Sequence, residues 1–135
     1  MGIVLHLPMN AVWYEMVESL QKTHEYRDIT PYWISRLVKK PYVNMIKVNC
    51  KDAWHREKYS DNELAEYIES LTKQFGNIFK DFDFVDFSYG YTKRHMHFEH
   101  QSTNIGFGKP DWGAKQGKKC FVIMLGGRLI EEELQ

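Results

Sequence analysis

The chain has 135 residues, of which 18 are Lys or Arg, 18 are Asp or Glu, and 43% are hydrophobic. A chain of this length buries about two-thirds of the surface that its unfolded form exposes, so we expect a single domain over residues 1–135 that needs no structural metal. The even charge balance argues against a basic protein that reads duplex DNA or coats a membrane surface. Cys50 and Cys120 stand in no C-x-x-C spacing, no secretory leader is evident, and the N-terminal apolar run is too short to span a membrane. These features predict a cytoplasmic protein.

Strands are predicted at two places in the first part of the chain. Ile3–Leu7 is a short apolar run that stops at Pro8, as a buried strand would. Thr23–Ile29 is a second candidate strand with many polar side chains. Tyr42–Val48 could be a third, and the polar stretch Asn49–Ser60 is then expected to be a loop.

Three helices are predicted in the first 75 residues. Asn10 can cap the first, whose apolar face would consist of Trp13, Met16, Val17 and Leu20. Thr30 and Pro31 suit the start of the second, which would run to about Lys39. The third begins at a capping box, Ser60-x-x-Glu63, and its periodic apolar positions are Leu64, Tyr67, Ile68, Leu71 and Phe75.

From Asp81 onward the apolar period changes to two, which predicts strands. In Arg94–Ile105, Met96 and Phe98 fall on one side, and the opposite side carries His95, His97 and Glu99. A loop is expected at 106–113, a buried strand at 121–125, and a tight return at Gly126-Gly127. The whole pattern predicts an α+β domain with a small β-barrel flanked by helices.

Two segments resemble a known family. Lys22-Thr23-His24-Glu25-Tyr26-Arg27-Asp28, followed by Pro31-Tyr32-Trp33, resembles the signature of ASCH domains, which belong to the PUA-like superfamily. The C-terminal segments 105–114 and 121–126 are similar to the end of a phage-associated subgroup of that family. Residues 41–80 fall outside the resemblance and are interpreted as a helical insertion.

The resemblance implies a PUA-like barrel with a cleft between barrel and helices, and a function in nucleotide chemistry. Members have been proposed to bind RNA, some resemble amidohydrolases on acylated cytidine-type nucleosides, and one resembles a ribonuclease. By position, the family's lysine is Lys22, its acidic residue Glu25 and its arginine Arg27. Glu25 stands where the amidohydrolase pattern has threonine, and a third catalytic position can be assigned only to Glu99 by its place on a strand. Leu20 replaces a helix-ending Gly found in many members.

The side chains in this segment suit acid–base chemistry and anion binding. A lysine beside a carboxylate can exchange protons near neutral pH when both are buried, although a Lys-x-x-Glu pair can equally be a surface ion pair of little value. Arg27 suits bidentate binding of a phosphate, or a salt bridge to a neighbouring carboxylate. The candidate catalytic residues are therefore Lys22, Glu25 and Glu99.

Aromatic side chains form the second candidate group. Bases stack on exposed rings without sequence readout, and the candidate binding residues are Tyr26, Arg27, Trp33 and Trp112. Trp33 and Trp112 could instead be packing residues. Lysines and arginines outnumber carboxylates in residues 36–58 and again in 109–119, which would give a phosphate-attracting rim if these runs face the cleft.

Histidines raise a metal hypothesis, because His95-x-His97-x-Glu99 places three donors on one strand face. A polar strand face open to solvent is the commoner meaning of such a pattern, and we expect no metal and no cofactor. His6 and His24 fit structural hydrogen bonding equally well.

The leading hypothesis is a domain that binds RNA, a nucleoside or a nucleotide, with no membrane partner and no duplex-DNA reading. The alternatives are an amidohydrolase on an N4-acetylcytidine-like nucleoside, a ribonuclease, or a protein-interaction module that uses the acidic helix near residues 61–69.

Overall fold

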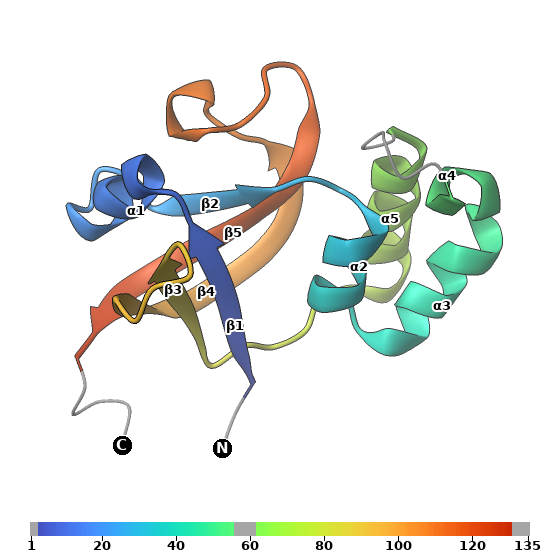
Figure 1. Cartoon of the computed structure of the whole chain (residues 1–135). Helices are drawn as coiled ribbons and strands as arrows, with labels where there is room; N and C mark the ends of the chain where they lie inside the picture. Colours follow the sequence, from blue (N-terminus) through green and yellow to red (C-terminus); the bar gives the residue numbers. More distant parts are fainter. Residues whose placement is uncertain (1–2, 56–61, 131–135) are drawn as a thin grey trace. The chain divides into compact units, whose positions relative to one another are not determined.

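The structure is a computed structural model that describes residues 3–55 and 62–130. Its helices and strands are shown in Figure 1. In chain order they are β1 (Val4–Met9), α1 (Ala11–Glu18), β2 (His24–Arg27), α2 (Pro31–Leu37), α3 (Lys40–Asn49), α4 (Lys51–His55), α5 (Asn62–Phe75), β3 (Phe84–Tyr89), β4 (His95–Phe107), the 3-10 turn η1 (Pro110–Trp112) and β5 (Lys119–Leu129).

The strands form one five-stranded sheet in the order β1-β3-β4-β5-β2. β1 runs parallel to β3, and β3 runs antiparallel to β4. The sheet is strongly curled, as in half of a barrel, which confirms the predicted α+β class and agrees with a small β-barrel flanked by helices. No helix in the described ranges is long and apolar enough to cross a membrane.

The packing of the chain divides it into two compact units. Unit 1 comprises Met1–Glu25, Asp81–Ser102 and Ile123–Gln135, and unit 2 comprises Tyr26–Lys80 and Thr103–Val122. β2, β4 and β5 each have residues in both units. The predicted single domain over residues 1–135 stays a prediction.

Unit 1 is built on the alternation of buried and outward-facing positions along its strands. In β1, Leu5, Leu7 and Met9 are buried while His6 is exposed. The strand continues through Pro8 instead of stopping there, because β1 lies at the edge of the sheet, where a residue without an N–H group is tolerated. On the buried side, Phe87 of β3 meets Phe98 of β4 edge to face, with ring centroids 5.9 Å apart.

Unit 2 contains the helices α2 to α5, and here one sequence prediction is wrong. Tyr42–Val48, a candidate strand, lies in α3, and Pro41 is in the first turn of this helix. Proline suits the start of a helix as well as the position after its end. Val43, Ile46 and Cys50 are buried at spacings of three and four, which is the helical period.

Three further boundaries differ from the predictions. The expected loop 49–60 contains the short helix α4, and its remainder from residue 56 lies outside the described residues. β5 continues through Gly126-Gly127 to Leu129 where a tight return was expected. α1 buries Tyr14 and Val17 and ends at Glu18, so Leu20 is not on its apolar face.

The predicted helix starts agree with the structure where they can be compared. The Asn10 side chain accepts a hydrogen bond from the Trp13 N–H at 3.2 Å, and the Thr30 hydroxyl accepts one from the Trp33 N–H at 3.3 Å. α5 buries Leu64, Ala65, Ile68 and Leu71, close to the predicted face. Ser60 of the expected capping box lies outside the described residues.

Leu20 follows the C-cap of α1 in a left-handed conformation, with φ of 65°. This is the conformation that a glycine after a helix commonly adopts. Leu20, which stands where many ASCH domains have glycine, therefore keeps the turn of the backbone. Because a residue with a Cβ atom is strained in the left-handed conformation, this turn costs some stability of the folded state.

We expect Leu20→Gly to raise the free energy of unfolding by about 0.5–1 kcal/mol, because the relief of left-handed strain exceeds the entropy cost of glycine. Leu20 is 64% exposed, so little buried surface is lost. Urea unfolding would measure the gain. Leu20→Ala keeps the Cβ and should give no gain; equal stabilisation by both substitutions would contradict the explanation.

Candidate functional site

Lys22 and Glu25, the predicted acid–base pair, form a buried ion pair in unit 1. Lys22 Nζ lies 2.9 Å from Glu25 Oε1, and the two side chains are 1% and 7% exposed. The Lys22 ammonium also lies 4.8 Å from the centroid of the Trp13 ring in α1. The alternative of a surface ion pair is therefore excluded, and the pair connects the segment after α1 to β2.

Glu99, the third predicted catalytic residue, lies exposed on β4 in unit 1. It packs directly over Gly126 of β5, where an added Cβ would come within 2.8 Å of Glu99 Oε2. A proton-transfer role for Lys22 needs a substrate that reaches its Nζ atom, which is covered in this structure. The catalytic roles of Lys22, Glu25 and Glu99 stay predictions.

The predicted binding residues Tyr26, Arg27, Trp33 and Trp112 all belong to unit 2. Near the start of α2, cationic side chains stack on aromatic rings. Arg27 Cζ lies 4.8 Å from the centroid of the Trp33 ring, and Arg36 Cζ lies 4.4 Å from that of Tyr32. The Tyr32 and Trp33 rings meet edge to face at 5.0 Å. Arg36 and Tyr32 extend the predicted set.

A second group of rings and cations lies in the loop after β4, which contacts Tyr26, the residue before Arg27 in β2. The Tyr26 hydroxyl accepts a hydrogen bond from the backbone N–H of Lys109 at 3.1 Å. An added Cβ on Gly108 would come within 2.6 Å of the Tyr26 ring, so only glycine allows this approach. Farther along the loop, Lys109 Nζ lies 4.1 Å from the centroid of the Trp112 ring.

These residues are called the stacked surface below: Tyr26, Arg27, Tyr32, Trp33, Arg36, Lys109 and Trp112. Arg36 and Lys109 are both exposed, and neither forms an ion pair with any residue that the structure describes. By contrast, Lys115 is paired with Asp28 at 3.0 Å and Lys119 with Glu69 at 2.7 Å. The stacked surface thus offers rings together with two cations, Arg36 and Lys109, that no carboxylate in the described ranges pairs with.

Some charges of the predicted basic runs and of the acidic helix make contacts within unit 2. Lys39 Nζ of the first run donates to the Asn77 carbonyl oxygen, and Lys119 of the second run pairs with Glu69 of the acidic helix. Arg56, Lys58 and Asp61 lie outside the described residues. A rim of cations facing the predicted cleft stays a prediction.

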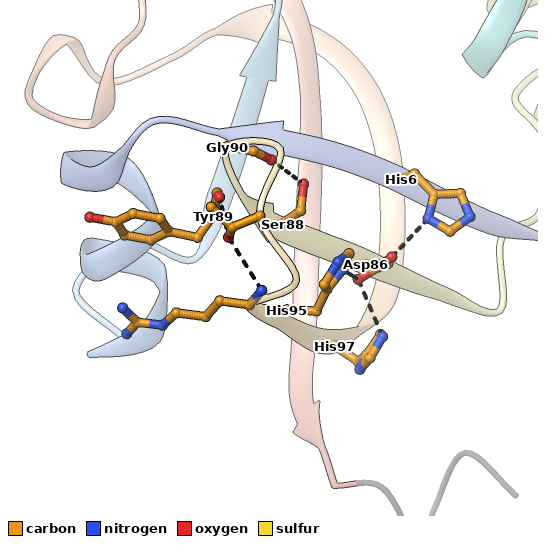
Figure 2. Close-up of polar contacts among 9 residues, drawn as sticks. His6, Asp86, Ser88, Tyr89, Gly90, His95 and His97 are labelled. Carbon is orange, nitrogen blue, oxygen red and sulfur yellow. Dashed lines mark hydrogen bonds and ion pairs between the residues drawn. The ribbon is translucent and has the colours of Figure 1, made fainter.

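A second polar group lies in unit 1 and was not predicted as a unit. Asp86 of β3 is contacted by three histidines (Figure 2). His6 Nδ1 lies 2.8 Å from Asp86 Oδ2, His95 Nδ1 lies 2.8 Å from Oδ1, and His97 Nε2 lies 3.2 Å from the same oxygen. We call His6, Asp86, His95 and His97 the histidine cluster.

Strand register brings the histidine cluster together. His6 is the register partner of Asp86 across the β1–β3 pair, and Asp86 is that of His97 across the β3–β4 pair. These three residues therefore form a row across the outward side of the strands, and His95 is two residues before His97 on the same side. The alternation in Arg94–Ile105 correctly predicted that His95 and His97 share a side.

The sequence analysis did not identify Asp86 as a site residue and left the role of His6 undecided. A signal for Asp86 was present in the sequence, since it is a charged residue within an otherwise apolar run of β3. Pairing it with His6 needs the parallel register of β1 and β3, which joins residues 80 positions apart. The metal hypothesis for His95, His97 and Glu99 gains no support: among residues 3–55 and 62–130, no group of three or more His, Cys, Asp or Glu could hold a metal ion.

Two other titratable groups of unit 1 are perturbed by burial. Burial lowers the pKa of the His100 imidazole below its ordinary value of 6.5, and the nearby Asp81 carboxylate opposes this. Burial also raises the pKa of Tyr14 above its ordinary value of 10.0, with a contribution from Glu18 and an opposing one from Arg94. Arg94 itself is paired with Glu18 at 2.9 Å.

Comparison with known proteins yields no family: no family model, no curated protein and no solved structure matches this chain. Candidate functions are therefore inferred from the residues and geometry described above, together with the resemblance to ASCH domains.

We expect Lys22→Met to lower the free energy of unfolding by about 3–5 kcal/mol, because it leaves the buried Glu25 carboxylate without its ammonium partner. Chemical denaturation at neutral pH would measure this loss. The double variant Lys22→Met/Glu25→Gln removes the buried charge and should recover part of the stability. A loss of less than about 1 kcal/mol, as for a surface ion pair, would contradict a structural role for this pair.

The lowered pKa of His100 makes stability depend on pH. The unfolded chain takes up a proton on this imidazole near pH 6.5, before the folded protein does. The contribution of His100 is therefore fully present above pH 6.5 and is lost as the pH falls through the lower folded-state pKa.

Urea midpoints measured from pH 7.5 down to pH 5 should fall less steeply for His100→Gln than for the parent protein. His55→Gln, which changes an exposed histidine of α4, is the matched control and should keep the parent slope. Identical slopes for the parent and His100→Gln would show that burial of this imidazole does not couple folding to protons.

Proposed function

We propose that this protein binds single-stranded RNA or a nucleotide through the stacked surface of unit 2. The observation that carries the proposal is that Arg36 and Lys109 lie against aromatic rings while no described carboxylate neutralises them. Rings stack with bases, and cations contact phosphates, so each of these two ring–cation contacts offers complementary groups to both halves of a nucleotide.

The geometry of the rings favours single strands over a duplex. Tyr32 is 53% exposed, and its ring is held by Arg36 on α2 and by the edge of Trp33. A base can stack on such a ring, or on a guanidinium plane, only when its own face is accessible, as it is in a single strand. Duplex binding in contrast relies on many phosphate contacts, for which a chain with 18 basic and 18 acidic residues is poorly suited.

The connection between Tyr26 and Lys109 gives the surface a fixed framework. The hydrogen bond from the Lys109 N–H to the Tyr26 hydroxyl, and the close approach of Gly108 to the Tyr26 ring, hold the 108–112 loop against the end of β2. A surface whose side chains are already ordered loses less conformational entropy on binding. The likeness of residues 22–28 to ASCH domains, for which RNA binding has been proposed, supports the same ligand class.

The proposal predicts that a short fluorescein-labelled single-stranded RNA binds in a fluorescence-anisotropy titration. Tyr32→Ala should raise the Kd by about 5- to 150-fold, which corresponds to the ~1–3 kcal/mol of one base–ring stack. Arg36→Ala and Lys109→Ala should weaken binding and each reduce the slope of log K against log salt by about 0.7.

Lys73→Ala is the matched control for these variants, since Lys73 is an exposed cation of unit 2 on α5. It should leave both the Kd and the salt slope unchanged. Equal binding by the parent protein, Tyr32→Ala and Arg36→Ala would disprove the stacked surface as the binding site, and the absence of any binding by the parent would disprove the function.

A further inference from the structure

We propose that His6 and His95, oriented by Asp86, form a general acid–base pair that cleaves RNA by transfer of a phosphodiester to the neighbouring 2′-hydroxyl. The choice of RNA as the substrate rests on the RNA binding proposed above, but the catalytic residues are a separate set in unit 1.

Asp86 orients the imidazoles of His6 and His95. Asp86 is almost covered, with a side chain 10% exposed, whereas the His6 and His95 side chains are 67% and 39% exposed. Each of these two rings directs Nδ1 to the carboxylate, which leaves Nε2 as the outer nitrogen. The carboxylate fixes both rings, as it does wherever an Asp orients a histidine for proton transfer.

The outer nitrogens of His6 and His95 can accept a proton from a substrate or donate one to it. Within residues 3–55 and 62–130, the Nε2 atoms of His6 and His95 form no hydrogen bond or ion pair with another protein group. His97 differs: its Nε2 is turned toward Asp86, and its ring meets that of Phe84 edge to face at 5.3 Å. His97 is therefore a positioning residue, as is Asp86.

Both rings contact the same carboxylate, His6 at Oδ2 and His95 at Oδ1. Imidazole is the side chain most often used to transfer protons to and from a reacting group. Of two imidazoles held on one carboxylate, one can therefore accept a proton while the other donates one. Glu99, exposed two residues beyond His97 on the same side of β4, is the other charged group on this stretch of the strand.

Among the residues that the structure describes, none beside the histidine cluster is placed as a nucleophile, which limits the substrates that the pair could act on. The Ser88 hydroxyl, which lies next along β3 on this side, donates its hydrogen bond to the Gly90 carbonyl oxygen at 2.8 Å (Figure 2). Two proton-transfer groups without a nucleophile suit a substrate that supplies its own. RNA does so, because its 2′-hydroxyl lies beside the phosphodiester.

The reaction balances with these two residues alone. The neutral imidazole takes the 2′-hydroxyl proton as the 2′-oxygen forms a bond to phosphorus. The bond from phosphorus to the 5′-oxygen breaks, and the imidazolium gives its proton to that oxygen. The products are a 2′,3′-cyclic phosphate and a 5′-hydroxyl, and the two rings have exchanged protonation states, which solvent restores.

The test is incubation of the protein in EDTA with a short fluorescein-labelled RNA from pH 5 to 8, followed by electrophoresis and mass spectrometry of the ends. We expect cyclic phosphate ends, a bell-shaped pH profile, and rates that are lower by about 10²- to 10⁴-fold in His6→Gln and in His95→Gln. His55→Gln, purified identically, should keep the full rate and controls for a contaminating nuclease.

Asp86→Asn tests the positioning role by separating kcat from KM. Loss of the carboxylate should lower kcat and leave KM near the parent value, because the orientation of the rings is lost while the RNA-binding surface is unchanged. A raised KM with the parent kcat would count against this role. His6→Gln, at an exposed position, tests the pair independently if Asp86→Asn fails to fold.

The proposal is overturned if the parent protein cleaves no RNA at any pH, if His6→Gln and His95→Gln cleave as fast as the parent, or if DNA of the same sequence is cleaved. A 2′-O-methyl RNA, which lacks the nucleophile, separates this result from the binding proposal. If the protein binds the 2′-O-methyl RNA but cleaves no unmodified RNA, the acid–base pair is overturned and the proposal of RNA binding stands. If it cleaves RNA but the variants of the stacked surface bind as the parent does, the acid–base pair stands and the stacked surface is overturned as the binding site.

Discussion

The parallel pairing of β1 with β3 is the constraint on which the rest of the structure depends. Two antiparallel strands can be joined by a tight turn, but two parallel strands need a crossover long enough to return to the same end of the sheet. Here the chain between Met9 and Phe84 includes α1, β2 and all of α2 to α5. The same pairing sets His6 opposite Asp86 and buries Leu5 and Leu7 on the other side of the strand.

The distribution of charge follows from what each element buries. The chain has no net charge, yet the Lys22–Glu25 pair lies in the interior while Arg36 and Lys109 remain exposed without a described carboxylate partner. A buried charge must be paired, because desolvation costs several kcal/mol, whereas an exposed cation stays hydrated and needs no partner. The net charge of zero is thus the sum of charges paired in the interior and charges exposed to solvent.

Local signals in the sequence were sufficient for several elements. The side chains of Asn10 and Thr30 cap their helices as predicted, since a cap is a contact between residues three positions apart. α3 was mistaken for a strand because Pro41 marks either end of a helix and an apolar segment of seven residues fits both periods. Gly126-Gly127 was taken for a turn, but Glu99 needs a residue without a side chain beneath it.

The sequence by itself determined which side of each strand is apolar and which residues could act chemically, because side-chain alternation is a property of the strand alone. It predicted that His95 and His97 lie on the same side of one strand, and that Lys22 and Glu25 are close enough in the chain to form an ion pair. Only the tertiary structure decided that this pair is buried and that Asp86 joins histidines from β1 and β4. The reason is that burial and register depend on pairing between distant segments, and a shift of one residue would turn His6 away from Asp86.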